Sequence, residues 1–459
     1  MHFTTYEFIA FFAVILIFNS LGALLNTGFR KISLIVFSYY FYYLFNFEFI
    51  LFLLAISIIT FVFSTILTNR LFTFRKIFLS LGILSILSVL VALKYFDFII
   101  TSLSTYFPQI LQSITLVDII TPIGISYISF KSISLIIDTY RGTVSSVKLV
   151  DVFLYLSFFP QLLAGPIERY NGLISQISLT NLSNIDFSKY AFRFCWGVFK
   201  KLIIVSALFS NDLMSIFQIP EKYSAIDLLL GIYLFSAYIF IDFSGYTDIS
   251  NGLSGMLGIK CGENFNKPYS ASSISEFWKK WHISLSNWIR DYVYIPLGGN
   301  RVGKFRNYLN LIIAMTLAGI WHGANLNFLI WGFLHGLLIV LSRISLFGNR
   351  FKFVGVFITF NLISLLWIFF NTESLDVAFE YFKGLINFNS DYILLSYANI
   401  ALLIIAIIIH NYEDQVISIV SIFINRFRFF YQGIFLGIIL WLVFELAPET
   451  TPFFIYYQF

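Results

Sequence analysis

The sequence has little charge and only two cysteines. Only 12% of its 459 residues are charged and 59% are hydrophobic, with a mean hydropathy of +0.84. This excludes a soluble globular domain, in which about a quarter of the residues are charged. The cysteines, Cys195 and Cys261, are far apart and have no metal-ligand spacing. They exclude a disulfide framework and predict two structural thiols without a metal site. The net charge of +5 is modest and does not indicate a nucleic-acid partner.

Long hydrophobic runs recur along the whole chain. They span residues 8–25, 50–67, 77–93, 202–208, 228–241, 353–370, 393–409 and 434–444. Several reach the roughly 20 residues that a helix needs to cross a bilayer. The continuous run at 400–409 contradicts the alternating pattern of a transmembrane β-barrel. The sequence therefore predicts an all-α polytopic membrane protein, and its first run has no basic region or cleavage site typical of a signal peptide.

Clusters of lysine and arginine alternate with segments that contain few of them. The clusters lie at residues 30–31, 70–76, 141–148, 189–201, 260–306, 343–352 and 426–428. Because cytoplasmic loops are enriched in basic residues, this alternation predicts about twelve crossings, some of them short, with both termini outside. Residues 151–165 are too short to cross and are predicted to form a re-entrant element. No repeat or linker divides the chain, so we expect one membrane domain over residues 1–459.

The largest cytoplasmic segment is predicted to contain a helix in the plane of the membrane. On a helical wheel of residues 277–292, aromatic and aliphatic side chains share one face and charged side chains share the other. Ile283 is the one residue that does not fit. This pattern is typical of an interfacial helix. It places His282 at the edge of the apolar face, from which it can point inward.

A second histidine lies where the chain must turn. Residues 308–321 form 14 residues of helix, about 21 Å, which is shorter than the apolar core of a bilayer. The chain then turns through His322-Gly-Ala-Asn325 and returns through residues 328–341. A polar turn at membrane depth must line a cavity or be buried in protein. His282 and His322 are therefore predicted at the two ends of one passage.

Histidine is the usual general base near neutral pH, and this arrangement suits acyl transfer across a membrane. His322 either deprotonates an acceptor hydroxyl or carries the acyl group itself, and the residues alone leave a buried structural histidine open. His335 is predicted to be a packed helix histidine, and His2 and His410 to be solvated near span ends. Two aspartates, Asp242 and Asp248, directly follow an apolar run. They either pair with basic side chains to hold helices together or line the passage.

Five stretches together resemble the membrane-bound O-acyltransferase (MBOAT) family, in its bacterial alginate and peptidoglycan O-acetyltransferase branch. They are residues 122–142, 158–170, 238–253, 276–301 and 319–336, and the ending at 454–459 is also similar. The resemblance implies a ring of about ten to twelve tilted helices, with re-entrant and in-plane cytoplasmic helices, around a central tunnel. D-alanyl exporters of teichoic acid are more distant relatives.

The resemblance also implies roles for individual residues. His322 matches the invariant family histidine and His282 matches the second one, so both are candidate catalytic residues. Asn325 is implied to orient the histidine or bind substrate. The remaining substrate or tunnel candidates in the matched stretches are Trp321, Asp242, Trp281 and Arg290. Lys280 stands where relatives often have arginine, for which we expect little consequence.

The implied activity is O-acetylation of an envelope polysaccharide at the bacterial cytoplasmic (inner) membrane. The acceptor is peptidoglycan or an alginate-like exopolysaccharide, the donor is acetyl-CoA without a bound cofactor, and an extracytoplasmic protein of the SGNH-hydrolase type is the partner. The alternatives are D-alanyl transfer to teichoic acid, a non-enzymatic transporter, and a structural scaffold for a partner enzyme. A transporter or a scaffold predicts that replacement of His322 is tolerated.

Overall fold

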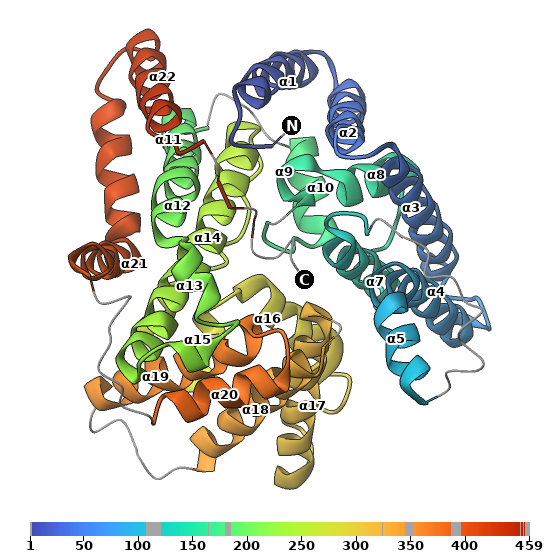
Figure 1. Cartoon of the computed structure of the whole chain (residues 1–459). Coiled ribbons are helices and arrows are strands. Elements are labelled where there is room, and N and C mark those ends of the chain that lie inside the picture. The colour runs from blue at the N-terminus through green and yellow to red at the C-terminus, as the bar shows by residue number, and fades with distance from the viewer. Residues whose placement is uncertain are drawn as a thin grey trace. The chain divides into compact units, whose positions relative to one another are not determined.

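The computed structural model describes residues 2–106, 121–163, 165–179, 185–323, 325–344, 352–386, 396–449, 451–452 and 454. All secondary-structure elements among these residues are helical (Figure 1). The predicted all-α class is therefore confirmed. In the family-like ending, only Phe454 is described, and residues 455–459 lie outside the described residues.

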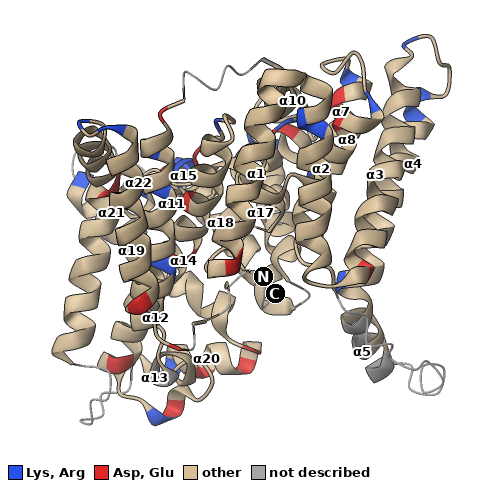
Figure 2. Cartoon of the chain, turned by 90° about the horizontal axis from the view of Figure 1, so that it is seen from above, with Lys and Arg blue, Asp and Glu red and all other residues tan. Residues whose placement is uncertain are grey.

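Seven helices of the described part are long and apolar enough to cross a membrane. They are α1 (Tyr6–Leu25), α3 (Phe47–Thr68), α4 (Arg75–Leu90) with the π-helical turn η1 (Val91–Tyr95), α14 (Ala225–Met256), α18 (Leu326–Ile344), α19 (Lys352–Asn371) and α21 (Tyr397–Ile424). Figure 2 shows that the charged residues of α3 and α4 lie near the helix ends. A polytopic membrane protein is confirmed, and the remaining crossings of the predicted ten to twelve stay a prediction.

Polar side chains begin several of these helices. The side-chain oxygens of Thr5, Asn46 and Ser396 accept hydrogen bonds from backbone N–H groups in the first turns of α1, α3 and α21. Such N-caps satisfy donors that have no partner inside the helix. Short polar residues between apolar runs therefore mark where these spans begin.

The chain divides into two compact units. The first contains Met1–Tyr190 and Ser250–Gly262, and the second contains Ala191–Ile249 and Glu263–Phe459. The prediction of one membrane domain stays a prediction. Besides α1, α3 and α4, the first unit contains α2 (Thr27–Tyr43), α5 (Phe96–Tyr106), α7 (Ile125–Arg141), α8 (Leu149–Ser157), α9 (Phe159–Leu162) and α10 (Tyr170–Leu179). In this unit, α3 packs against α4 and α7, and α2 packs against α1 and α8.

A buried arginine connects distant parts of the first unit. Arg30 donates to Asn19 Oδ1 at 2.8 Å and to the carbonyl oxygens of Ile177 and Leu257 at 2.8 and 2.6 Å. A buried guanidinium needs such acceptors because removing it from water is costly. The segment predicted as a re-entrant element, residues 151–165, contains most of α8 and all of α9, which are separated at Phe158. A re-entrant path in the membrane stays a prediction.

The second unit holds both candidate catalytic histidines. Its helices include α14, α18, α19 and α21, and the others are α11 (Phe187–Phe199), η3 (Lys200–Ile204), α12 (Val205–Leu208), α13 (Asn211–Ser215), η4 (Pro220–Lys222), η5 (Pro268–Ser270), α15 (Ile274–Lys280), α16 (Ile283–Ile289), η6 (Arg290–Tyr294), α17 (Lys304–His322), α20 (Leu375–Gly384) and α22 (Phe429–Glu445). The helices α17 and α18 pack closely against each other.

Two glycines allow α17 and α18 to approach closely. A Cβ atom on Gly319 would come within 2.1 Å of the Phe328 carbonyl oxygen and 2.9 Å of Gly332 Cα. We expect Gly319→Ala to separate the helices and to lower the free energy of unfolding by about 1–3 kcal/mol, as overpacking does. Thermal unfolding of the purified protein measures the loss. Gly437→Ala in α22 is the matched control, because a Cβ there meets nothing within 4 Å. Equal stability of both variants would contradict the close packing.

Candidate active site

The prediction of one continuous helix over residues 277–292 is wrong, because the chain breaks at His282. Its orientation in the plane of the membrane stays a prediction. The helix α15 ends at Lys280, and α16 begins at Ile283. Between them, His282 has the left-handed conformation, with φ 42° and ψ 54°. A residue in this conformation cannot continue a right-handed helix. Asn264 holds the break, since its carbonyl oxygen accepts from Ile283 N and its side chain accepts from Ser284 Oγ at 2.6 Å.

Trp281 is buried in protein instead of facing lipid at a membrane interface. It is 1% exposed and stacks on Phe277 with ring centroids 5.5 Å apart. Phe265 and Trp367 lie against it at 5.1 and 5.2 Å. The aromatic face that the helical wheel placed at the membrane interface therefore packs against other residues of the second unit. A role of Trp281 in a tunnel stays a prediction.

The His282 ring points edge-on at an aromatic neighbour. Its centroid lies 4.7 Å from that of Phe243, at an interplanar angle of 88°. His282 is outside the candidate spans, and burial lowers its pKa to about 3. The imidazole is therefore neutral at physiological pH.

His322 is the last residue of α17, at the start of the predicted turn. Its ring lies 4.8 Å from Trp321, 5.2 Å from Trp331 and 5.3 Å from Phe370. Gly323 is extended, and α18 starts at Leu326, which confirms a turn at this point. The depth of the turn in a membrane stays a prediction.

Trp321 brings the two histidines together. Its ring centroid lies 6.4 Å from His282 and 4.8 Å from His322. We call these three residues the histidine pair with its bridging tryptophan. The break at His282 and the end of α17 place both imidazoles next to one indole.

Asn325 binds backbone groups next to the turn. Its Nδ2 donates to Glu373 O at 2.7 Å, and its Oδ1 accepts from Asn327 N at 3.2 Å. Asn327 in turn donates to Thr372 O at 2.7 Å. These bonds join the turn after His322 to the connection between α19 and α20. They support a positioning role for Asn325.

Arg290 lies on the surface. Its side chain is 56% exposed, and its Nε donates to the adjacent Asp291 at 2.8 Å. It begins the π-helical turn η6, beyond the histidine pair. These contacts do not bring it to either imidazole, and its substrate role stays a prediction.

Asp242 forms a buried ion pair. The side chain is fully buried in α14 and accepts from Lys201 Nζ at 2.5 Å. Lys201 also lies over the Tyr246 ring, with Nζ 5.4 Å from its centroid. Of the two predicted alternatives for the aspartates, pairing with basic side chains is confirmed.

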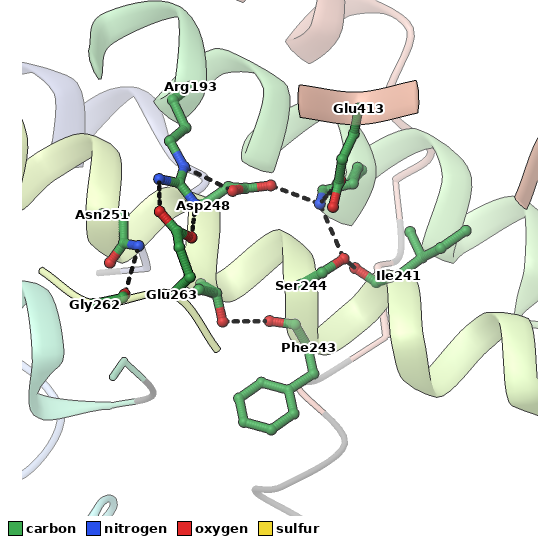
Figure 3. Close-up of polar contacts among 11 residues, drawn as sticks. Arg193, Ile241, Phe243, Ser244, Asp248, Asn251, Gly262, Glu263 and Glu413 are labelled. Carbon is green, nitrogen blue, oxygen red and sulfur yellow. Dashed lines mark hydrogen bonds and ion pairs between the residues drawn. The ribbon is translucent and has the colours of Figure 1, made fainter. Parts of the chain in front are cut away.

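Asp248 belongs to a larger ion-pair network, drawn in Figure 3. Lys200, whose side chain is fully buried, binds Asp248, Glu413 and Ser244 Oγ at 2.6, 2.8 and 2.9 Å. On the other side, Arg193 donates to Asp248 at 2.8 Å and to both oxygens of Glu263. The network joins α11 and η3 to α14 and α21.

Sequence reasoning missed the basic partners. It assigned residues 189–201 to a cytoplasmic cluster, whereas Lys200 and Lys201 are buried and bind aspartates that lie six residues apart on α14. That spacing is about 9 Å along a helix. The signal was available, because two lysines directly precede an apolar run and two aspartates follow another.

The remaining histidines and the cysteines have clear surroundings. His335 is a packed helix histidine, as predicted, and its Nδ1 accepts from Trp278 Nε1 at 3.2 Å. The predicted solvation of His410 is wrong, since it is buried against Phe240 and accepts from Tyr269 N at 3.1 Å. Cys195 and Cys261 are buried free thiols. Within the described ranges, no group of three or more metal-ligand side chains gathers.

The neutral state of His282 makes stability depend on pH. Between pH 6.5 and 3 the unfolded chain binds a proton at His282 that the folded protein excludes, so stability falls as pH is lowered. We expect this residue to contribute up to about 1.4 kcal/mol per pH unit in that window. Thermal unfolding of wild type and His282→Gln at pH 7.5, 6 and 5 measures it. The variant should lose less stability on acidification, and identical pH dependence would contradict the prediction.

The sequence is similar to those of several known proteins. A sequence model described as MBOAT, membrane-bound O-acyltransferase family, matches residues 32–372. The chain is 36% identical over 385 residues to the probable alginate O-acetylase AlgI of Pseudomonas aeruginosa, covering 82% of this chain and 73% of that protein. It is 32% identical over 352 residues to a peptidoglycan O-acetyltransferase of Helicobacter pylori, covering 69% and 66%.

A third relative is a teichoic acid D-alanyltransferase of Bacillus subtilis, 32% identical over 235 residues, with 48% of this chain and 59% of that protein covered. The chain thus spans between 59% and 73% of the length of these three relatives. The family match covers His282, Trp321 and His322, together with the ion pairs of Asp242 and of Asp248 with Lys200 and Arg193. The chain belongs to the membrane-bound O-acyltransferase family.

Proposed function

We propose that this O-acyltransferase transfers acetyl groups from a cytoplasmic thioester, most simply acetyl-CoA, to a polysaccharide of the bacterial envelope. The observation that carries the proposal is the histidine pair with its bridging tryptophan, in which both imidazoles are buried and Trp321 is half-buried. The relatives named for acetylation of alginate and peptidoglycan support the acetyl group and the type of acceptor. The protein acts in the cytoplasmic membrane, with an extracytoplasmic SGNH-hydrolase-like partner.

In the proposed reaction, His322 acts as a general base. Its neutral imidazole takes the proton of an acceptor hydroxyl, and the oxygen attacks the thioester carbonyl carbon. The C–O bond forms, the C–S bond breaks, and the leaving thiolate takes up a proton. Trp321, Trp331 and Phe370 surround His322 and exclude water, which would otherwise hydrolyse the thioester. His282, across Trp321, lies on the donor side of the same site.

D-alanyl transfer is the second candidate, supported by the Bacillus subtilis relative. The two reactions use the same ester-forming chemistry but different donors. Incubating membranes that contain the protein with labelled acetyl-CoA, or with a D-alanyl carrier protein, separates them. We expect label from acetyl-CoA alone to enter the envelope polymer.

The decisive experiment measures base-releasable acetate in purified peptidoglycan and in exopolysaccharide. A strain without the gene is complemented with wild type or with His322→Ala. We expect one fraction to lose acetate and only wild type to restore it, which also names the acceptor. Unchanged acetate in both fractions would sink the proposal, and restoration by both proteins would remove His322 from the reaction.

A further inference from the structure

The N–H groups of two adjacent rings of α18, Trp331 and His335, take no part in the proposed general-base step. Trp331 and His335 are one helical turn apart and are 1% and 0% exposed. Their ring centroids are 4.5 Å apart, and Trp331 lies 5.2 Å from the His322 ring. Trp331 therefore belongs to the wall around the candidate catalytic histidine, and His335 packs directly against Trp331.

The hydrogen bond from Trp278 determines where His335 carries its proton. An indole N–H can only donate, so His335 Nδ1, which accepts from it at 3.2 Å, has no proton. The neutral ring then carries its proton on Nε2. His335 consequently presents an N–H donor on the side of the ring opposite Trp278.

Two N–H donors are thus buried near His322. His335 Nε2 and Trp331 Nε1 each meet no hydrogen-bond acceptor among the described residues. Buried donors in native proteins are normally satisfied by protein, water or a ligand. Their ring neighbours are aromatic, and both donors are neutral. A carbonyl oxygen, which has two lone pairs, is a suitable acceptor for two such donors.

We propose that Trp331 Nε1–H and His335 Nε2–H bind the carbonyl oxygen of the acyl group during its transfer at His322. This inference rests on the proposed function, which brings a thioester carbonyl to this site. When the acceptor oxygen adds to the carbonyl carbon, the C=O electron pair moves onto the oxygen. The two donors stabilise that charge until the C–S bond breaks and the carbonyl re-forms.

Three substitutions separate donation from packing. Trp331→Phe keeps an aromatic ring and removes one N–H. His335→Asn keeps an acceptor for Trp278 and removes the distal donor, whereas His335→Gln keeps an N–H near the position of Nε2. Initial rates of thiol release from acetyl-CoA, in membranes that contain the full chain, give kcat and KM. We expect kcat to fall about 10²–10³-fold in Trp331→Phe and His335→Asn, with KM nearly unchanged, and His335→Gln to recover much of the loss.

A spectroscopic measurement reports on the carbonyl itself. Acetyl-CoA labelled with ¹³C at the carbonyl is bound to purified His322→Ala protein, which does not consume it. We expect the C=O stretching frequency to be lowered on binding. Adding Trp331→Phe or His335→Asn should return it toward the value of free acetyl-CoA, because hydrogen bonds to the oxygen weaken the C=O bond.

The outcomes distinguish this inference from the proposed function. An unshifted frequency for bound acetyl-CoA, or wild-type kcat in both folded donor variants, would overturn the inference and leave the acetyl donor in place. If acetyl-CoA does not bind, the proposed donor is wrong. The C=O stretching frequency of a bound D-alanyl thioester then shows whether the N–H groups of Trp331 and His335 bind the carbonyl oxygen of that thioester.

Discussion

Replacing His322 by alanine is expected to abolish acetyl transfer while the protein still inserts into the membrane. A general base contributes about 10²–10⁴-fold to the rate, and alanine has no group that can take its place. The side chain lies at the end of α17, where its removal leaves the cap and the close contact of α17 with α18 intact. Acetate released from the envelope polymer, divided by the amount of protein in the membrane, is the measurement.

His2→Ala is the matched control for this prediction. His2 also contacts an aromatic ring, Phe45 at 5.6 Å, but it belongs to the first unit, whereas the histidine pair belongs to the second. We expect wild-type acetylation from it. Normal acetylation by His322→Ala at equal abundance would support a transporter or a scaffold, both of which tolerate loss of this imidazole.

Lys201→Met is expected to be the most destabilising single change in the ion pairs of α14. It removes the cation that binds the fully buried Asp242 carboxylate. Breaking a buried pair leaves an uncompensated charge, which costs about 3–5 kcal/mol. The loss is measured as a lower unfolding midpoint of the purified protein and as a smaller amount of folded protein in the membrane.

Two further variants test whether loss of the Lys201–Asp242 ion pair causes the lower stability. The double variant Lys201→Met/Asp242→Leu should recover much of the stability, because no charge is left unpaired. Lys280→Met breaks a partly exposed pair with Glu276 at 2.8 Å and should change stability by at most about 1 kcal/mol. If Lys201→Met were as mild as Lys280→Met, Asp242 would have another source of compensation.

If the double variant is stable but inactive, the pair has a second role. Asp242 lies in a stretch that resembles the family, and Tyr246 in the same stretch contacts both Lys201 and Phe454. Phe454 also lies 5.8 Å from Phe243, which contacts His282. A chain of contacts therefore runs from the ion pair to the histidine pair, and activity of the stable double variant tests whether it matters.

Properties that depend on nearby residues could be predicted well from the sequence. Continuous apolar runs require helices, because a backbone in lipid must satisfy its own hydrogen bonds. The polar residues after His322 predicted the turn between α17 and α18, whereas α17 has 19 residues instead of the 14 predicted before the turn. The composition of the segment around His335 predicted a packed histidine, and Trp278 and Trp331 pack against it.

Contacts between distant segments depended on the tertiary structure. The periodicity of residues 277–292 describes a continuous helix, but the bonds from Asn264 hold a left-handed residue at His282. Likewise, a basic cluster looks solvated in the sequence, while Lys200 and Lys201 meet carboxylates on α14 and α21. Hydrophobicity and helical period report how each segment meets its surroundings. The packing of distant helices determines which side chains compensate a buried charge. It also determines which indole contacts both imidazoles.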